Sequence, residues 1–295
     1  MSRTVVMPLT KPSRRRAGAK ALRAWYAPRR GAYPWRGTRD PYAIWVSEVM
    51  LQQTQAARVV RAYREFLERF PTVHALAAAP RRDVVRAWDG LGYNRRAVRL
   101  SEGARVIVRE HQGRIPRGPA TLRTLPGVGP YTAAAVASLA FGEPVAVVDT
   151  NVRRVVARVH LGLDGRVAET GQVSNLAQAW LDVDDPVTWN QAVMDLGREV
   201  CKSRPRCEIC PLSRVCRFRA SGAIAVQGET SQPVFEGSSR QVRGAVVRAL
   251  RAHETLSPGK LALETGFVAE RVDAAVDALV ADGLVEVSSG RVRLA

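Results

Sequence analysis

The stretch Leu125-Pro126-Gly127-Val128-Gly129-Pro130-Tyr131-Thr132-Ala133 combines a tight turn with the start of a helix. Its two glycines stand directly before an alanine-rich run, which predicts a helix near residues 130–141. Glycine lets the backbone approach another molecule closely, and the amide groups at a helix start can bind an anion such as a DNA phosphate. An ordinary turn between two helices explains the glycines equally well when nothing else supports DNA.

Outward from this turn, the hydrophobic pattern is helical from about residue 19 to residue 200, which predicts a mainly α domain. Asp40 and Pro41 predict the N-cap and first turn of a helix that carries Trp45 and Glu48. Further helices are expected near residues 55–70, 81–88, 94–112, 130–141, 149–161, 172–182 and 186–198. Before them, residues 1–18 are predicted to be a basic, disordered tail.

The C-terminal part is predicted to be a separate small domain. Residues 220–238 are rich in Gly, Ser and Gln without periodicity, which is typical of a linker. Residues 239–295 contain three helical patterns, and Val285–Leu294 alternates around Ser288-Ser289-Gly290 as a β-hairpin does. This order predicts a winged-helix-like α+β domain. A small dimerisation or packing module without a nucleic-acid role is the alternative.

The charge of the chain favours an anionic partner. Its 295 residues include 45 basic and 27 acidic ones, for a net charge of +18. Such a balance favours a nucleic acid or a membrane surface. The longest nearly apolar stretch, Ala133–Phe141, has about half the length of a spanning helix, and the N-terminus does not resemble a secretory signal. We therefore expect a cytoplasmic protein that does not enter a membrane.

The four cysteines of the chain are packed into sixteen residues as C-x5-C-x2-C-x5-C: Cys201, Cys207, Cys210 and Cys216. Four thiolates this close together predict one metal centre, either a tetrahedral zinc site or a cubane iron–sulfur cluster. The spacing alone does not distinguish the two metals. Six basic residues surround the cysteines against the single acid Glu208, so the loop is suited to meet phosphate.

Two carboxylates suggest catalysis. Glu48 lies mid-helix among apolar neighbours, which should keep it protonated, whereas Asp149 precedes a helix start, which stabilises the anion. One neutral and one ionised acid form the pair that breaks a glycosidic bond. The alternatives are a simple N-cap for Asp149 and a solvated or paired helix residue for Glu48.

Five motifs in order resemble the adenine DNA glycosylases (the MutY family) of the helix–hairpin–helix DNA glycosylase superfamily. They are Ser47–Gln55, Gly90–Tyr93, Leu125–Ala133, Val148–Val152 and the four cysteines, and the resemblance covers roughly residues 20–219. It implies a six-helix barrel lobe plus a [4Fe–4S] cluster lobe, with the active site between the lobes. It also implies removal of adenine mispaired with 8-oxoguanine or guanine in double-stranded DNA, by a monomer associated with the nucleoid.

The resemblance also implies roles for single residues. Glu48 would be the general acid that protonates adenine, Asp149 would stabilise the oxocarbenium ion, and Tyr131 and Asn151 would support it. The implied DNA-binding residues are Gln53, Leu91, Tyr93, Gly127, Gly129, Gln191 and Arg36. Among them, Gln191 would bind the extruded adenine, and Gln53, Leu91 and Tyr93 would wedge into the base stack. Core packing and helix capping are the alternatives for Leu91, Tyr93 and Gln191.

Tyr131 separates this chain from endonuclease III, which resembles it but carries at this position a lysine that forms a Schiff base with the sugar. Tyrosine cannot form an imine, so we expect hydrolysis that leaves an abasic site, with little or no lyase activity. Two rivals remain. One is a thymine-mismatch or oxidised-pyrimidine glycosylase of the same superfamily, and the other is a non-catalytic iron–sulfur regulator that binds DNA.

The chain departs from the family pattern at three places. The first cysteine spacing is one residue shorter than usual, and Asn94 stands where many relatives have a second aromatic. Residues 239–295 are also too short for the Nudix-like domain that inspects 8-oxoguanine in the usual family architecture. We expect the short domain to supply duplex affinity or part of that inspection.

Overall fold

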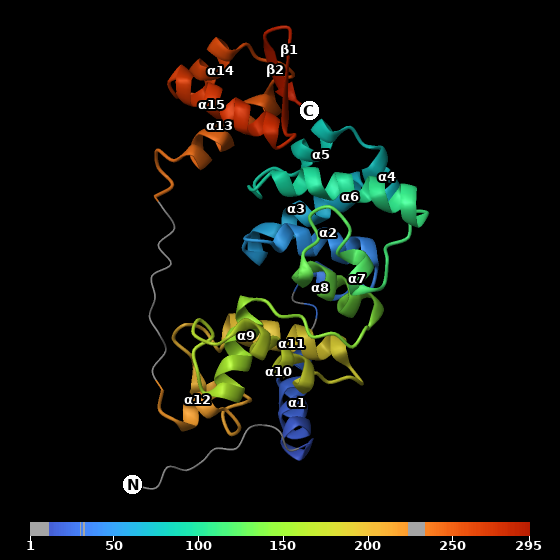
Figure 1. Cartoon of the computed structure of the whole chain (residues 1–295), viewed down its shortest axis with the longest axis vertical. Coiled ribbons are helices and arrows are strands. Elements are labelled where there is room, and N and C mark those ends of the chain that lie inside the picture. The colour runs from blue at the N-terminus through green and yellow to red at the C-terminus, as the bar shows by residue number, and fades with distance from the viewer. Residues whose placement is uncertain (1–11, 30, 32, 224–233) are drawn as a thin grey trace. The chain divides into compact units, whose positions relative to one another are not determined.

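The computed structural model describes residues 12–29, 31, 33–223 and 234–295 (Figure 1). The chain forms two compact units, and each is described by itself. The first contains the described residues of Met1–Ile44, Arg117–Arg123 and Val128–Glu229, and the second contains those of Trp45–Pro116, Thr124–Gly127 and Thr230–Ala295. The mainly α fold and the small C-terminal α+β part confirm the predicted fold class.

Where the structure describes the first unit, its main secondary-structure elements are helices. They are α1 (Pro12–Tyr26), α7 (Pro119–Leu122), α8 (Pro130–Phe141), α9 (Thr150–Val156), α10 (Thr170–Trp180), α11 (Pro186–Glu199) and α12 (Arg217–Ala220), with a π-helical turn η3 (Ala157–Leu161) after α9. Helix α8 has the predicted bounds because Pro130 occupies its first turn and Gly142 ends it in the left-handed region.

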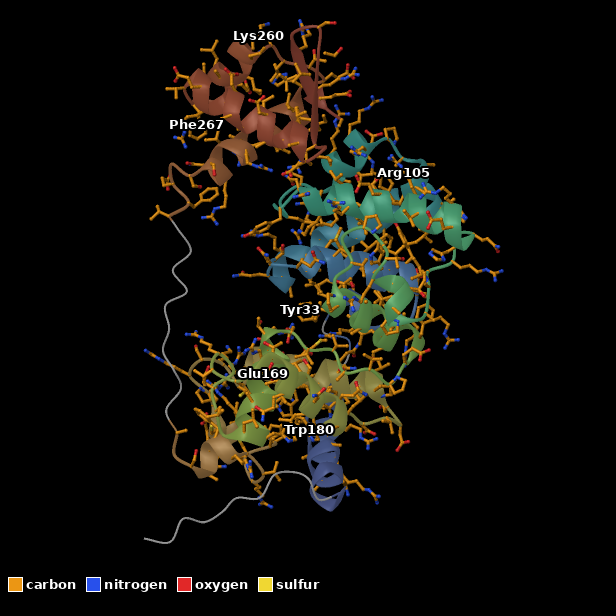
Figure 2. All side chains as sticks on the ribbon, viewed as in Figure 1. Tyr33, Arg105, Glu169, Trp180, Lys260 and Phe267 are labelled. Carbon is orange, nitrogen blue, oxygen red and sulfur yellow. The ribbon has the colours of Figure 1, made fainter. Side chains whose placement is uncertain are left out.

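Helix α11 forms the centre of the first unit and packs against α1, α8 and α9. Nearly every residue of α11 is buried. Trp189 meets Trp180 edge to face at 5.4 Å between ring centroids, and Trp180 meets His160 in the same way at 4.9 Å. Figure 2 labels Trp180 among the side chains of the first unit. These ring contacts hold α11 against α10 and η3.

The second unit begins with helices α2 (Pro41–Leu51), most of which belongs to it, α3 (Ala56–Arg69), α4 (Val73–Ala78), α5 (Arg81–Ala87) and α6 (Arg95–His111). Helix α6 packs against α4 and α5. A side chain at Gly103 of α6 would place its Cβ 2.8 Å from the ring of Trp45, so this glycine allows α2 and α6 to approach each other closely.

The C-terminal part of the second unit has the predicted winged-helix order (Figure 1). Helices α13 (Ser239–Ala252), α14 (Pro258–Thr265) and α15 (Ala269–Ala281) pack on one another, and the strands β1 (Val285–Ser288) and β2 (Arg291–Leu294) pair antiparallel with Val285 opposite Leu294. Ser289 and Gly290 turn the hairpin with positive φ. Leu256 bridges to Val292 and adds a third extended segment.

Some predictions about the ends of the domains need correction. The predicted disordered tail is wrong from Pro12 onward, because α1 begins there and buries Ala19, Leu22 and Tyr26 on one face. Residues 1–11 of the tail lie outside the described residues, as do 224–233 of the predicted linker. Among the described residues, none of the helices combines the length and apolar character needed to cross a bilayer.

Candidate functional site

Asp149 caps the N-terminus of α9. Its Oδ1 accepts a hydrogen bond of 2.6 Å from the backbone N–H of Val152, and its Oδ2 accepts one of 2.8 Å from Nδ2 of Asn151. Both bonds hold the carboxylate at the N-terminal end of the helix, where the backbone N–H groups point toward it. The N-cap role that the sequence left as an alternative is therefore real, and it fixes the carboxylate in place.

The extended segment before Asp149 is held by two polar side chains. Asn190 of α11, fully buried, donates to the carbonyl of Val145 at 2.9 Å and accepts from the N–H of Val147 at 2.8 Å. Gln178 of α10 accepts from the N–H of Ala146 at 2.9 Å. Since α10 and α11 pack inside the first unit, these bonds fix the segment before Asp149 and so the position of Asp149 at the start of α9.

Asn151 connects Asp149 to the segment that carries the first cysteine. Its Oδ1 accepts a hydrogen bond of 2.9 Å from Nη2 of Arg154. The same Nη2 also donates to the carbonyl of Gly197 at 2.7 Å. Nε of Arg154 donates to the carbonyl of Cys201 at 2.5 Å. A Cβ at Gly197 would lie 2.7 Å from Cβ of Asn151, so α9 and α11 are in direct contact here. The catalytic candidates Asp149 and Asn151 are thus brought together, with Arg154 behind them.

Glu48 lies in α2, in the second unit. Only 4% of it is exposed, and its neighbours Ser47 and Val49 are buried to a similar degree. The acid is therefore buried, as the sequence led us to expect, and its catalytic role stays a prediction. The solvated alternative is excluded, because a carboxyl group at 4% exposure has little contact with water.

Two further active-site candidates lie in the first unit. Tyr131 stands in the first turn of α8 and is half-buried. Gln191 of α11 is buried, and its Oε1 accepts a hydrogen bond of 2.8 Å from the hydroxyl of Tyr26 in α1. Tyr26 carries no sequence motif, yet it fixes the orientation of the Gln191 amide.

The two glycines of the hairpin have different reasons to be glycine. Gly127 has φ of +76°, and a Cβ there would lie 2.7 Å from Cβ of Arg99, so both conformation and close packing require it. Gly129 has an ordinary φ of −83° as the N-cap of α8, and nothing lies within 4 Å of its Cβ position. Its missing side chain leaves the start of α8 open to an approaching molecule.

Gln53 and Tyr93 lie at two exposed turns of the second unit. Both have positive φ, 54° and 45°, and Tyr93 is 47% exposed. Such a conformation is uncommon for residues other than glycine and is typical of functional turns. Leu91 is only 3% exposed, so in this structure it is a core side chain, as the alternative interpretation held.

Arg96 ties these two turns together, and sequence reasoning missed it. Its guanidinium donates hydrogen bonds of 2.6–3.4 Å to oxygens of Val49, Met50, Gln52, Thr54, Leu91, Gly92 and Tyr93. Burial lowers the pKa of Arg96 to about 10, so it remains charged at neutral pH. One side chain therefore satisfies the carbonyls at the end of α2 and those of the Leu91–Tyr93 turn.

The side chain of Arg36 is largely buried. Only 8% of its side chain is exposed, and its Nη2 pairs with Asp195 at 2.9 Å. A guanidinium in an internal ion pair has little surface to offer a DNA phosphate. The structure therefore gives Arg36 an internal ion pair, and its contact with DNA stays a prediction.

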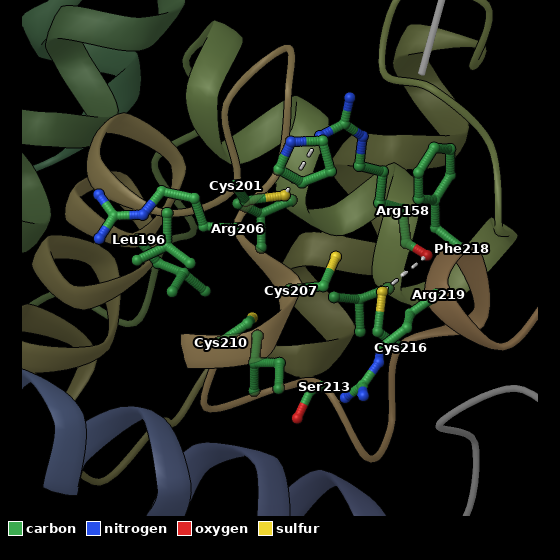
Figure 3. Close-up of a pocket in the computed structure, with 15 residues that line it drawn as sticks. Arg158, Leu196, Cys201, Arg206, Cys207, Cys210, Ser213, Cys216, Phe218 and Arg219 are labelled. Carbon is green, nitrogen blue, oxygen red and sulfur yellow. Dashed lines mark hydrogen bonds between the residues drawn. The ribbon is translucent and has the colours of Figure 1, made fainter. Parts of the chain in front are cut away.

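The four cysteines line one pocket of the first unit (Figure 3). Apolar side chains from η3, α11 and α12 complete its wall, among them Val159, Leu196 and Phe218. Within residues 12–29, 31, 33–223 and 234–295, no three His, Cys, Asp or Glu side chains are grouped as the ligands of one metal ion. The shared pocket nevertheless brings together the four residues that the sequence assigned to one centre.

Arg158 organises the cysteine pocket from within. It is 1% exposed, and its guanidinium lies 3.6 Å from Sγ of Cys201 and 2.7 Å from Oδ2 of Asp164. Cys216 Sγ in turn lies 3.6 Å from the carbonyl of Arg158. The positive charge of Arg158 lowers the pKa of Cys201, but burial outweighs it, so the pKa of this thiol is raised on balance.

The donor set suits a thiolate-bound metal centre. Burial raises the pKa of the Cys210 thiol to about 11 and also raises the pKa values of Cys201 and Cys216. Four thiolates in such a pocket need compensating positive charge, which soft metals such as iron or zinc provide. The residues present therefore fit the centre that the sequence predicted.

The chain is similar to known DNA repair proteins. Residues 46–181 match the HhH-GPD superfamily base excision DNA repair protein family. An adenine DNA glycosylase of Mycolicibacterium smegmatis is 43% identical over 281 residues, covering 93% of this chain and 94% of that protein. The adenine DNA glycosylase of Homo sapiens is 45% identical over 211 residues, covering 68% of this chain but 39% of the human protein.

A solved structure shares the fold. A thermostable thymine-DNA glycosylase superimposes with a TM-score of 0.65 at 32% identity, covering 70% of this chain and 97% of that one. Its chain is matched almost completely, while about a third of the present chain lies beyond the match. The near full-length match to the mycobacterial protein extends further, and on it the chain belongs to the adenine DNA glycosylase family of the HhH-GPD superfamily.

Proposed function

We propose that this chain is a monofunctional adenine DNA glycosylase. It hydrolyses the N-glycosidic bond of adenine mispaired with 8-oxoguanine or guanine in double-stranded DNA, and it leaves an abasic site. The observation that carries the proposal is the contrast between two acids: Glu48 is buried at 4% exposure in α2, whereas Asp149 accepts two hydrogen bonds at a helix start. Family membership supports adenine as the base.

Each acid has a role that follows from its surroundings. A buried carboxyl group holds its proton until a basic ring nitrogen approaches, so Glu48 donates a proton to the leaving adenine. An ionised carboxylate opposes positive charge, so Asp149 stabilises the oxocarbenium ion that forms on the sugar. Asn151 keeps the Asp149 carboxylate oriented through its 2.8 Å hydrogen bond. Water then completes the hydrolysis at C1′.

The remaining candidate residues are proposed to bind the DNA and to orient the extruded base and its sugar. Adenine must leave the base stack before an enzyme can reach it, and Gln53 and Tyr93 are exposed at turns suited to enter the gap. Gln191, oriented by Tyr26, would hydrogen-bond the extruded base. Tyr131 supports the sugar site and, lacking an amine, does not form a Schiff base.

The cysteine pocket is proposed to hold a [4Fe–4S] cluster through Cys201, Cys207, Cys210 and Cys216. When bound, the cluster supplies iron–sulfur bonds that fix the cationic loop between these residues. Arg158 provides charge balance beside Cys201, and the loop offers its basic residues to the DNA backbone. The enzyme is proposed to act as a monomer.

A panel of duplexes tests this function. Wild-type protein should form alkali-labile sites at A opposite 8-oxoguanine and A opposite G, and none at T opposite G or at an oxidised pyrimidine. Glu48→Gln should lower the single-turnover rate by roughly 10²–10⁴-fold while duplex affinity stays unchanged. Glu65→Gln, at an exposed glutamate of α3, is the matched control and should behave as wild type. Release of thymine instead of adenine would favour the thymine-mismatch alternative.

A further inference from the structure

Arg251 of α13 reaches out of the C-terminal domain, residues 239–295, to the end of α5. Nε and Nη2 of Arg251 donate to the carbonyl of Val85 at 3.2 and 3.0 Å. Its Nη1 forms an ion pair with Asp89, and its Nη2 donates to Oδ1 of Asn94 at 3.2 Å. Only 15% of the Arg251 side chain is exposed, whereas its partner Asp89 is 75% exposed.

The two side chains that Arg251 contacts stand on either side of one short loop. Asp89 directly precedes residues 90–93, and Asn94 directly follows them. Three of the four loop residues have positive φ: Gly90 at 73°, Gly92 at 66° and Tyr93 at 45°. Glycines adopt such φ values without strain, but Tyr93 does not, so Tyr93 keeps this conformation only where its surroundings hold it. The guanidinium of Arg251 contacts the side chains at both ends of this loop, Asp89 and Asn94.

Other contacts show that the C-terminal domain is docked at this corner. Arg81 donates to the carbonyl of Gly283 at 3.2 Å, and a Cβ at Gly283 would lie 3.0 Å from the Arg81 guanidinium. Arg95, the first residue of α6, pairs with Asp282 at 3.3 Å. The Arg251 bridge is therefore part of an extended contact with α5 and α6.

The side chain of Asn94 takes part in this contact through its amide oxygen. This oxygen accepts from Nη2 of Arg251 at 3.2 Å. An apolar side chain at this position would offer no oxygen to the guanidinium.

We infer that the C-terminal domain positions the loop of residues 90–93 through Arg251, so that Tyr93 is presented to the duplex for base extrusion. Arg251 is a positioning residue, because it acts through Asp89 and Asn94 and not on the substrate itself. The inference rests on the proposed function for the role of Tyr93 in extrusion. The bracing of the loop does not depend on that role.

The first test measures the loop without DNA. Amide hydrogen exchange is followed for residues 89–96 in the wild-type protein, in Arg251→Ala and in Arg248→Ala. Arg248 is exposed on the same helix, so its loss removes the same charge and makes it a matched control. Exchange in the loop should rise on the order of tenfold in Arg251→Ala and stay unchanged in Arg248→Ala. Equal exchange in all three proteins would overturn the inference, whatever the enzyme does.

The second test measures extrusion. In the Glu48→Gln background, the fluorescence of 2-aminopurine at the target position reports unstacking of the base. Arg251→Ala and Asn94→Ala should both reduce the signal, by about tenfold and by a smaller factor respectively, while thermal unfolding outside the C-terminal domain is unchanged. A full signal in Arg251→Ala would show that the brace does not serve extrusion and would overturn the inference. Failure of the wild type to release adenine would instead contradict the proposed function.

Discussion

The guanidinium of Arg154 joins the helix that Asp149 begins to the backbone of Cys201, through a hydrogen bond of 2.5 Å from Nε. The same side chain donates a hydrogen bond of 2.9 Å to Oδ1 of Asn151. Asn151 in turn donates to Asp149 and orients its carboxylate. Burial lowers the pKa of Arg154, and the neighbouring Cys201 and Asp149 offset part of that effect. The geometry of the proposed catalytic carboxylate and that of the cysteine loop are therefore coupled by one residue.

Arg154→Gln should weaken both sites together. We expect a fall of about 10–100-fold in the single-turnover rate and a parallel loss of bound iron, since an outer residue that orients ligands has effects of that size. Iron content, visible absorbance and adenine release check this. Arg153→Gln is the matched control, because Arg153 donates to the carbonyls of Gly165 and Ala168 instead. A variant that loses activity but keeps its iron would contradict the coupling.

Asp149→Asn should separate capping from catalysis. Asn is about as good an N-cap as Asp, so we expect the free energy of unfolding to change by less than about 1 kcal/mol. The developing cation would lose its counter-charge, and the rate should fall on the order of 10²-fold or more. Urea unfolding and single-turnover excision measure the two effects. A stable variant with a wild-type rate would remove Asp149 from the mechanism.

Arg96→Lys should loosen the turns that carry Gln53 and Tyr93. A lysine keeps the charge, but its three donors cannot satisfy the seven oxygens that the guanidinium serves. We expect a loss of roughly 2–4 kcal/mol in stability and a weaker preference for mismatched over matched duplex. Calorimetry and competition binding test this. Arg58→Lys, at an exposed position of α3, should change neither quantity.

Tyr131→Lys should create a lyase. A lysine at this half-buried position of α8 would bring an amine to the proposed sugar site, where it can form an imine with the opened abasic sugar. Borohydride should then trap a covalent protein–DNA complex that wild-type protein does not form. Tyr131→Phe should form none either. Trapping of the wild type at a comparable level would show that another amine acts and that the enzyme is not monofunctional.

Gly127→Ala and Gly129→Ala should differ in stability. Alanine at position 127 would adopt an unfavourable φ of +76° and meet Arg99, at a cost of about 1–3 kcal/mol. Alanine at position 129 has open space and an ordinary φ, so we expect an unchanged melting temperature. If Gly129 faces a DNA phosphate, its variant should still lose duplex affinity. Equal stability of the two variants would contradict the packing argument for Gly127.

Local signals in the sequence accounted for much of the fold. Pro130 and Gly142 gave α8 its correct ends, and the Ser289-Gly290 turn lay where the alternation of the terminal hairpin required it. Helix α4 was missed because its six residues are too few to show a helical period. The start of α1 was missed because the sequence shows a run of charges, whereas the burial of Leu22 and Tyr26 depends on partners far along the chain.

The candidate site was only partly predictable for a similar reason. Glu48 and Asp149 stand next to their own signals, an apolar helix and a helix start, so their surroundings could be inferred. Arg96, Arg154 and Arg251 act mainly on backbone carbonyls and on side chains brought near by folding. A carbonyl acceptor leaves no mark in a sequence, and this chain has many exposed arginines that look the same. Arg36 shows the converse, since a basic residue near a motif proved to be internal.

The contacts of Arg81, Arg95 and Arg251 have a consequence for the architecture of the chain. Residues 239–295 are not a freely exchangeable module, because they share side-chain partners with helices α5 and α6. A chimera that replaced them would have to acquire a new residue at position 94 at the same time. The C-terminal domain and the helices α5 and α6 are therefore expected to change together in evolution.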